Sequence, residues 1–138
     1  MSKKTKRFKE LSPTNTKLFK TPSLIDYDAY KPAFSFRDIR YGQKGCLSKC
    51  DRDNKSLIVD KLLKISQLTW KDIHSGRRQK YGYEHIPIKQ FKVQLPLAVT
   101  PDMNNLLVFR FSDAGRMAGY KTQDIFHIVA IGPKHDLY

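Results

Sequence analysis

Three apolar segments of strand length lie close together in the last third of the chain, over residues 105–111, 115–121 and 125–131. The linking sequences SDAG and TQD are short enough for hairpins, and so the pattern predicts a meander of three antiparallel strands. Far upstream, residues 33–39 read AFSFRDI, in which apolar and polar residues alternate before two glycines. This alternation predicts a further strand.

A helix is predicted between these strands. Asp51 or Asp53 can accept the free amide hydrogens of its first turn. The apolar residues that follow recur at helical spacing, and the lysines of this segment fall outside the stripe that they form. The predicted apolar stripe consists of Ile58, Val59, Leu62, Leu63 and Ile65.

A second short helix is predicted directly afterwards. It begins at Thr69, and Asp72 three residues later completes a capping box. The two helices form a helical hairpin. The elements together predict an α+β domain over residues 33–138, in which the hairpin packs on one face of a small, mostly antiparallel sheet. The opposite face of the sheet would then be open to a ligand.

Residues 1–32 are rich in Lys, Ser, Thr and Pro and have no sustained apolar period. Such a segment cannot bury enough surface to offset its ordering entropy. We therefore expect a flexible basic N-terminal extension, which is either an arm that follows a phosphate backbone or a solubilising tail. Tyr27 and Tyr30, near its end, are candidates for the first folded residues.

Residues 75–101 have the composition of a loop, with prolines, glycines and many cations. The cations interleave with aromatic rings, which suits single-stranded RNA because phosphates pair with the charges while bases stack on the rings. The alternative is a solvated loop whose tyrosines cover a sheet edge. The candidate RNA-binding residues are Arg77, Arg78, Lys80, Tyr81, Tyr83, Lys89 and Lys92.

The charge of the chain indicates its partners more than its fold. Its 138 residues include 26 Lys and Arg against 13 Asp and Glu, a net charge of +13. A phosphate backbone attracts such a surface through charge and counterion release, so RNA is the partner that we expect. An acidic protein partner is compatible with this. An anionic membrane is disfavoured, because no amphipathic helix suited to lie on one is evident.

Several other classes of protein are disfavoured by the sequence. No apolar run is long enough to span a membrane, and the basic N-terminus lacks the apolar core of a secretory signal, so we expect a cytoplasmic protein. Cys46 and Cys50 form a C-x3-C pair without a second pair, which does not match a zinc site. We expect free thiols packed as small apolar residues, and neither a metal nor a cofactor.

The C-terminal run VFRFSDAGRMAGYKTQDIFHIVAIGPKHDLY resembles the end of RelE-type toxins. In that family a strand with a basic residue, here Arg110, leads to a Gly-Arg turn, here at Arg116. A strand ending in Tyr120, an apolar strand and a Gly-basic segment that closes with Tyr138 complete the order. The predicted helical hairpin also fits. The chain departs from the family in its long N-terminal extension and in Lys134, where many members have Arg.

The resemblance implies an endoribonuclease toxin that cuts messenger RNA, often on the ribosome, and that a cognate antitoxin protein holds inactive. Metal-free RNA cleavage uses the 2′-hydroxyl as nucleophile and needs a base, cations that hold the charge on phosphorus, and an acid for the leaving oxygen. No acidic cluster for a magnesium pair stands out, which favours this route. The alternative interpretations are a non-enzymatic RNA-binding module and a module that binds an acidic protein.

Three cations are candidates for stabilising the phosphate. Arg116 ranks first, because it matches the turn-plus-Arg position of the family and its planar fork suits phosphate oxygens. Arg110 and Lys134 follow, Lys134 as a point charge. Each of the three also fits a solvated or salt-bridged surface cation.

Two histidines and a tyrosine are candidates for acid–base work. His135 lies in the C-terminal segment where related toxins place catalytic groups, and imidazole titrates near neutral pH. His127 lies in the middle of an apolar strand, where it also fits a satisfied core residue. Tyr138 could stack on a base or share a proton with it. His85 and Glu84 are lower-ranked alternatives for the base.

Overall fold

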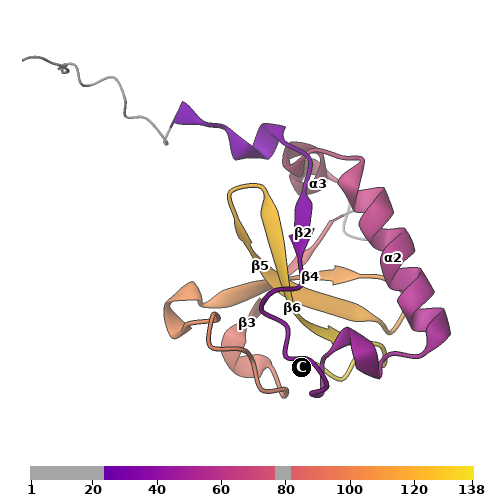
Figure 1. Cartoon of the computed structure of the whole chain (residues 1–138). Helices are drawn as coiled ribbons and strands as arrows, with labels where there is room; N and C mark the ends of the chain where they lie inside the picture. Colours follow the sequence, from indigo (N-terminus) through magenta and orange to yellow (C-terminus); the bar gives the residue numbers. More distant parts are fainter. Residues whose placement is uncertain (1–23, 77–81) are drawn as a thin grey trace, which may run out of the picture.

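The computed structural model describes residues 24–76 and 82–138, and its centre is a five-stranded mixed sheet of order β2-β6-β5-β4-β3 (Figure 1). The β2–β6 pair is parallel and the other three pairs are antiparallel. The strands are β2 (Ala33–Ser35), β3 (Glu84–Pro87), β4 (Asn105–Arg110), β5 (Arg116–Thr122) and β6 (Ile125–Gly132). The helices are α2 (Arg52–Ser66) and α3 (Trp70–Ser75), with 3-10 turns η3 (Tyr27–Ala29), η4 (Leu47–Lys49), η5 (Ile88–Gln90) and η6 (Pro101–Met103). The predicted α+β class is confirmed.

Local signals fixed both helices at the predicted places. The Asp51 side chain accepts a hydrogen bond from the Asn54 amide and caps α2. At α3, Thr69 Oγ1 accepts from the Asp72 amide while Asp72 Oδ2 accepts from the Thr69 amide, which is the predicted capping box. These bonds satisfy amide hydrogens that have no partner inside a helix.

The three predicted C-terminal strands are confirmed as β4, β5 and β6. The predicted end of the first strand and the predicted loop before β4 were wrong. The strand predicted over residues 33–39 ends at Ser35, because Ser35 Oγ accepts from the Arg37 amide and turns the chain. The predicted loop over residues 75–101 contains β3, which pairs with β4 at the sheet edge. This strand has only four residues and ends in Pro87, so it is too short to show the alternation of apolar and polar residues that predicts a strand.

The two helices pack on one face of the sheet (Figure 1). Trp70 is fully buried, and its Nε1 donates to the Asp124 carbonyl oxygen at 2.9 Å, which ties α3 to the β5–β6 turn. The buried members of this cluster from the helices and the sheet include Ile58, Ile65, Trp70, Ile73, Phe109, Met117, Phe126 and Ile128.

The apolar stripe of α2 is narrower than predicted. Ile58 and Ile65 are fully buried, whereas Val59 and Leu63 are exposed by 63% and 59%. Only the stripe that faces the sheet is covered by other elements, so the two residues that were predicted to widen it lie on the outer surface of the helix.

The second face of the sheet is covered, contrary to the prediction that it is open. The chain after β3 and the C-terminal residues fold over it and form a second apolar cluster. Its buried members are Val93, Leu106, Val108, Ala118, Val129, Ala130 and Leu137. The Lys92 amide donates to the Leu137 carbonyl at 2.7 Å and joins the two covering segments. A ligand site must therefore lie at an end or an edge of the sheet.

The predicted extension, residues 1–32, lies partly outside the described residues. The described residues begin at residue 24, and η3 packs beside α3, where the Tyr30 carbonyl accepts from the Trp70 amide at 3.0 Å. The described part of the fold thus begins before residue 33, near Tyr27 and Tyr30, the two candidates for the first folded residues.

Gly119 allows a close approach of β5 and β6. The register shifts between Ala118 and Gly119, where Ala118 pairs with Ala130 but Gly119 pairs with Ile128. A Cβ atom at Gly119 would overlap the backbone carbonyl of His127. The absence of a side chain is therefore required by the bulge.

Gly119→Ala is expected to lower the free energy of unfolding by about 3 kcal/mol, the upper range for overpacking, because a backbone atom is in the way. Urea unfolding measures this change. Gly42→Ala is the control: nothing lies within 4 Å of a Cβ there, and its φ of +78° alone should cost about 1–2 kcal/mol. Equal costs for the two variants would contradict the steric argument.

Candidate functional site

Arg116, the first predicted phosphate ligand, is turned into the protein. Its side chain is buried, with the residue 4% exposed. Nη1 donates to the carbonyl oxygens of Asp113 and Gly115 at 3.0 Å and of Ser112 at 3.3 Å. In this arrangement the guanidinium closes the turn between β4 and β5.

Of the other predicted catalytic residues, Arg110 lies at the end of the sheet where Arg116 pairs with Gly132, and the segment with Lys134, His135 and Tyr138 follows Gly132 directly. Arg110 pairs with Arg116 in register and lies 3.6 Å from the Glu84 carboxylate, measured from Nη2 to Oε2. His135 and Tyr138 are in ring contact, with centroids 5.2 Å apart. Lys134 lines a cavity whose lining includes neither arginine. His127 lies in the first half of β6, away from this end.

Of the predicted RNA-binding residues, Tyr83, Lys89 and Lys92 belong to the part of the chain that the structure describes. Arg77, Arg78, Lys80 and Tyr81 lie outside the described residues. Lys89 and Lys92 are exposed after β3. Tyr83 is half-buried on the helix-covered face, where its ring packs on Phe109 with centroids 5.6 Å apart.

An open groove lies where β5 extends beyond β4. The pairing of β4 with β5 ends at Leu107 and Gly119, whereas β5 continues to Thr122. The groove has a volume of about 480 Å³. Its lining combines polar, cationic and apolar side chains, namely His85, Met103, Asn105, Leu107, Tyr120, Lys121 and Thr122.

Behind one wall of the groove lies a hydroxyl–imidazole–carboxylate arrangement. Thr122 Oγ1 is 2.7 Å from His127 Nε2. The other ring nitrogen, His127 Nδ1, is buried without a hydrogen-bond partner and lies 3.9 Å from Asp38 Oδ2. In this geometry a hydroxyl is hydrogen-bonded to an imidazole, and a carboxylate faces the other side of the imidazole. Proteins use such an arrangement to pass a proton to or from a reacting group.

Tyr120 fixes this arrangement from the neighbouring strand. It pairs with His127 in register, and the rings stack with centroids 4.7 Å apart and planes 15° apart. Its hydroxyl donates to Asp38 Oδ2 at 2.6 Å. Burial, this hydrogen bond and the charge of Asp38 raise the pKa of Tyr120 above its ordinary value, so the phenol stays protonated as a donor.

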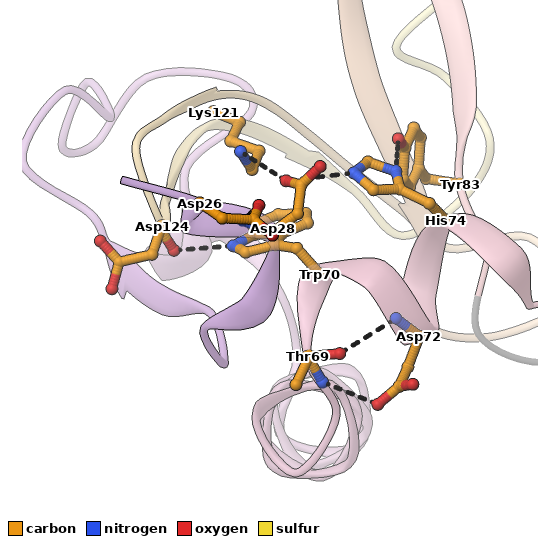
Figure 2. A network of polar contacts seen from close by, with 9 residues as sticks. All are labelled: Asp26, Asp28, Thr69, Trp70, Asp72, His74, Tyr83, Lys121 and Asp124. Carbon is orange, nitrogen blue, oxygen red and sulfur yellow. Dashed lines mark hydrogen bonds and ion pairs between the residues drawn. The ribbon is translucent and has the colours of Figure 1, made fainter. Parts of the chain in front are cut away.

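Lys121, between Tyr120 and Thr122 in β5, is held by the network in Figure 2. Lys121 Nζ lies 3.2 Å from Asp28 Oδ1 and 5.2 Å from the centroid of the Trp70 ring. Asp28 Oδ1 also lies 3.6 Å from His74 Nε2, and His74 Nδ1 is hydrogen-bonded to the Tyr83 hydroxyl. The ammonium group is therefore positioned by η3 and α3 although it belongs to β5.

The environment lowers the pKa of one group of this network and raises the pKa of another. Burial works against ionisation of Asp28, but the hydrogen bond to Lys121 and the charges of Lys121 and His74 outweigh it and lower the pKa of Asp28. Burial and the charge of Asp28 raise the pKa of Tyr83. The carboxylate thus stays ionised beside the cation, and the phenol stays neutral.

His85 connects this network to the groove. It is exposed, it lines the groove, and its ring packs edge-on against Tyr83 with centroids 5.3 Å apart. The residues that line the groove therefore include an exposed histidine, a lysine and a threonine whose hydroxyl is hydrogen-bonded to a buried imidazole. These groups can donate and accept protons and hold an anion.

Sequence reasoning named two of these groups and missed the others. The sequence indicates His127 for acid–base work and His85 as an alternative base, but it does not indicate Asp38, Lys121 or Thr122 as site residues. The predicted hairpin contained a signal for Thr122, because residues on either side of a short turn face one another across the strands. Nothing in the sequence places Asp38, which follows β2, beside them.

No protein-family model, curated protein or solved structure matches this chain. Within the described residues, no helix is long and apolar enough to cross a membrane. Over the same ranges, no group of three or more His, Cys, Asp or Glu side chains is placed to hold a metal ion. Cys46 and Cys50 are buried and form no disulfide, in agreement with their predicted packing.

Asp28→Asn is expected to destabilise the fold most above about pH 5. The folded-state pKa of Asp28 is below its ordinary value of 3.8, so its contribution is complete above that value and is lost as the pH falls through the folded-state pKa. Because the side chain is 43% exposed, we expect an effect of no more than about 1 kcal/mol.

Urea unfolding of both proteins between about pH 3 and pH 7 measures this difference. Asp102→Asn, which removes an exposed carboxylate in η6, controls for the loss of one negative charge. A destabilisation by Asp28→Asn that persists unchanged at the acidic end would show that the carboxylate's charge is not its source.

Proposed function

We propose that this protein binds single-stranded RNA and cleaves it without a metal ion, by attack of the 2′-hydroxyl on the adjacent phosphodiester. The observation that carries the proposal is the groove, which is lined by His85, Lys121 and Thr122, with Thr122 hydrogen-bonded to His127. A metal-free cleavage needs a base, a cation and an acid, and the groove offers one group for each. The net charge of +13 supports a polyanionic substrate.

Each group has a role that follows from its position. The exposed imidazole of His85 takes the proton from the 2′-hydroxyl, and the 2′-oxygen then bonds to phosphorus. The ammonium group of Lys121 holds the charge that develops on the phosphate oxygens. As the bond from phosphorus to the 5′-oxygen breaks, Thr122 donates its proton to that oxygen and receives one from His127 Nε2.

The two carboxylates orient the groups that move protons. Asp38 faces His127 Nδ1 and would orient the imidazole so that its Nε2 faces the Thr122 hydroxyl. Asp28 holds Lys121 at the groove in a network that also includes His74. Leu107 and Met103 supply an apolar wall against which a nucleobase can pack.

The resemblance to RelE-type toxins extends this proposal. It suggests that the RNA is messenger RNA, cut on the ribosome in the cytoplasm, and that an antitoxin protein controls the activity. The exposed C-terminal cations Arg110 and Lys134 would then contact the RNA beyond the groove. The buried contacts of Arg116 support a role in shaping the β4–β5 turn rather than in holding phosphate.

RNA binding without cleavage is the second candidate function. The inward orientation of Arg116 favours it, since the cation that best matches the family's phosphate ligand is occupied by backbone carbonyls. Under this alternative the groove binds RNA and its imidazoles move no proton.

Thr122→Val and His85→Ala are each expected to lower the rate of RNA cleavage by about 10²–10⁴-fold, the usual contribution of a general acid or base. Thr122→Ser keeps the hydroxyl and should retain most of the activity. The measurement is single-turnover cleavage of an unstructured messenger RNA fragment, with and without ribosomes, in the presence of EDTA.

Lys64→Ala is the control, because it removes an exposed cation of α2 that pairs with Asp60 outside the groove. The same set of proteins is tested for RNA binding at several salt concentrations. Salt-dependent binding by the unmodified protein without any cleavage would select the second candidate. Equal cleavage by Thr122→Val, Thr122→Ser and the unmodified protein would exclude the groove as the active site.

A further inference from the structure

A second cavity lies at the opposite end of β6, beyond the strand's last residues. Its volume is about 190 Å³. Three lysines, a thiol and a carboxylate line it together with apolar groups and backbone: Lys44, Gly45, Cys46, Lys49, Val93, Ile131, Pro133, Lys134, Asp136 and Leu137. None of these residues lines the groove.

The cavity has walls from two segments that are far apart in the sequence. The Gly45 carbonyl accepts from the Ile131 amide at 2.7 Å, which joins the turn before η4 to the end of β6. Gly45 has a φ of +95°, a conformation that favours glycine, and its neighbours Lys44 and Cys46 also line the cavity. Lys49 ends η4.

The charges around the cavity favour an anion. Three lysines stand against the single carboxylate of Asp136, which leaves an excess of two positive charges in the lining. Asp136 Oδ1 is buried without a hydrogen-bond partner in the described structure, and the residue also lines the cavity, so its carboxylate can accept a hydrogen bond from a ligand that carries a hydroxyl. The charge of Lys134 also contributes to lowering the pKa of Asp51, the cap of α2, after the hydrogen bonds from Asn54.

We propose that this cavity binds a phosphate group, with the ammonium groups of Lys44, Lys49 and Lys134 as its counter-charges and Asp136 as acceptor for a phosphate hydroxyl. Lysine serves as a point-charge ligand for phosphate. The volume corresponds to about six water molecules at about 30 Å³ each, which suits one phosphate group rather than a whole nucleotide.

Phosphate binding in this cavity does not require RNA cleavage. It rests on the proposed function only if the phosphate belongs to RNA. From Ile125, the partner of Thr122, to Ile131 the strand advances about 20 Å at about 3.3 Å per residue. A phosphate in the cavity is therefore too far from the groove to be the one that is cleaved. It is either another phosphate of the same RNA or a free phosphate.

Cys46 provides a reporter inside the cavity, and Cys50 an internal reference outside its lining. Burial works against ionisation of Cys46, but hydrogen bonds from the Ser48 hydroxyl and amide outweigh it and lower the pKa of the thiol. Burial and the charge of Asp51 raise the pKa of Cys50. A small neutral alkylating reagent should therefore modify Cys46 before Cys50, since the thiolate is the reactive form.

Inorganic phosphate is expected to slow alkylation of Cys46 at least threefold and to raise the melting temperature, relative to sodium chloride of equal ionic strength. Both effects should disappear in Lys44→Gln/Lys49→Gln and persist in the control Lys89→Gln, which removes an exposed lysine of η5. No effect in the unmodified protein, or an equal effect in the double variant, would overturn the proposal. Amide shifts of Gly45 on phosphate titration test the site if the double variant does not fold.

The source of the phosphate is tested with oligonucleotides and the cleavage-deficient Thr122→Val variant, which leaves the cavity intact. Protection of Cys46 by an oligonucleotide with a 5′-phosphate, but not by its 5′-hydroxyl form, would identify a terminal RNA phosphate. Protection by both forms would identify the RNA backbone. Protection by inorganic phosphate alone would support the site and exclude RNA as its ligand, whatever the outcome of the cleavage assay.

Discussion

The pairing of β5 with β6 is the constraint on which the rest of the structure depends. It runs from Arg116 and Gly132 at one end to Thr122 and Ile125 at the other, and both apolar clusters draw on these two strands. The bulge at Gly119 sets the register beyond it. That register puts Tyr120 beside His127, so the side chains of the candidate site depend on the backbone irregularity directly before Tyr120.

Much of the fold follows from short-range patterns in the sequence. The capping residues Asp51 and Thr69 marked both helices because their side chains bond to amides only three residues away. The C-terminal strands were equally accessible, since two short turns join them. β3 was missed because an edge strand of four residues gains its order from pairing with β4, which lies about 20 residues further along the chain.

The candidate site was predictable only where its residues share a hairpin. His127 and Thr122 lie on neighbouring strands joined by a tight turn, whereas Asp38 lies near His127, and Asp28 near Lys121, from segments more than 80 residues away in sequence. Arg116 shows the opposite case. Its position in the sequence matched a phosphate ligand, but three backbone carbonyls of the adjacent turn bind its guanidinium, and no pattern of residue types shows the direction of a side chain.

The cost of burying polar groups argues that the site beyond Gly119 has a role other than stability. His127 is 5% exposed and its Nδ1 has no hydrogen-bond partner in the described structure, which typically costs about 1–3 kcal/mol. A leucine in the same strand would carry no such cost and would extend the apolar cluster that Val129 and Ala130 already form. A buried imidazole that is fixed by a stacked tyrosine and hydrogen-bonded to a hydroxyl in an open groove is instead suited to moving a proton.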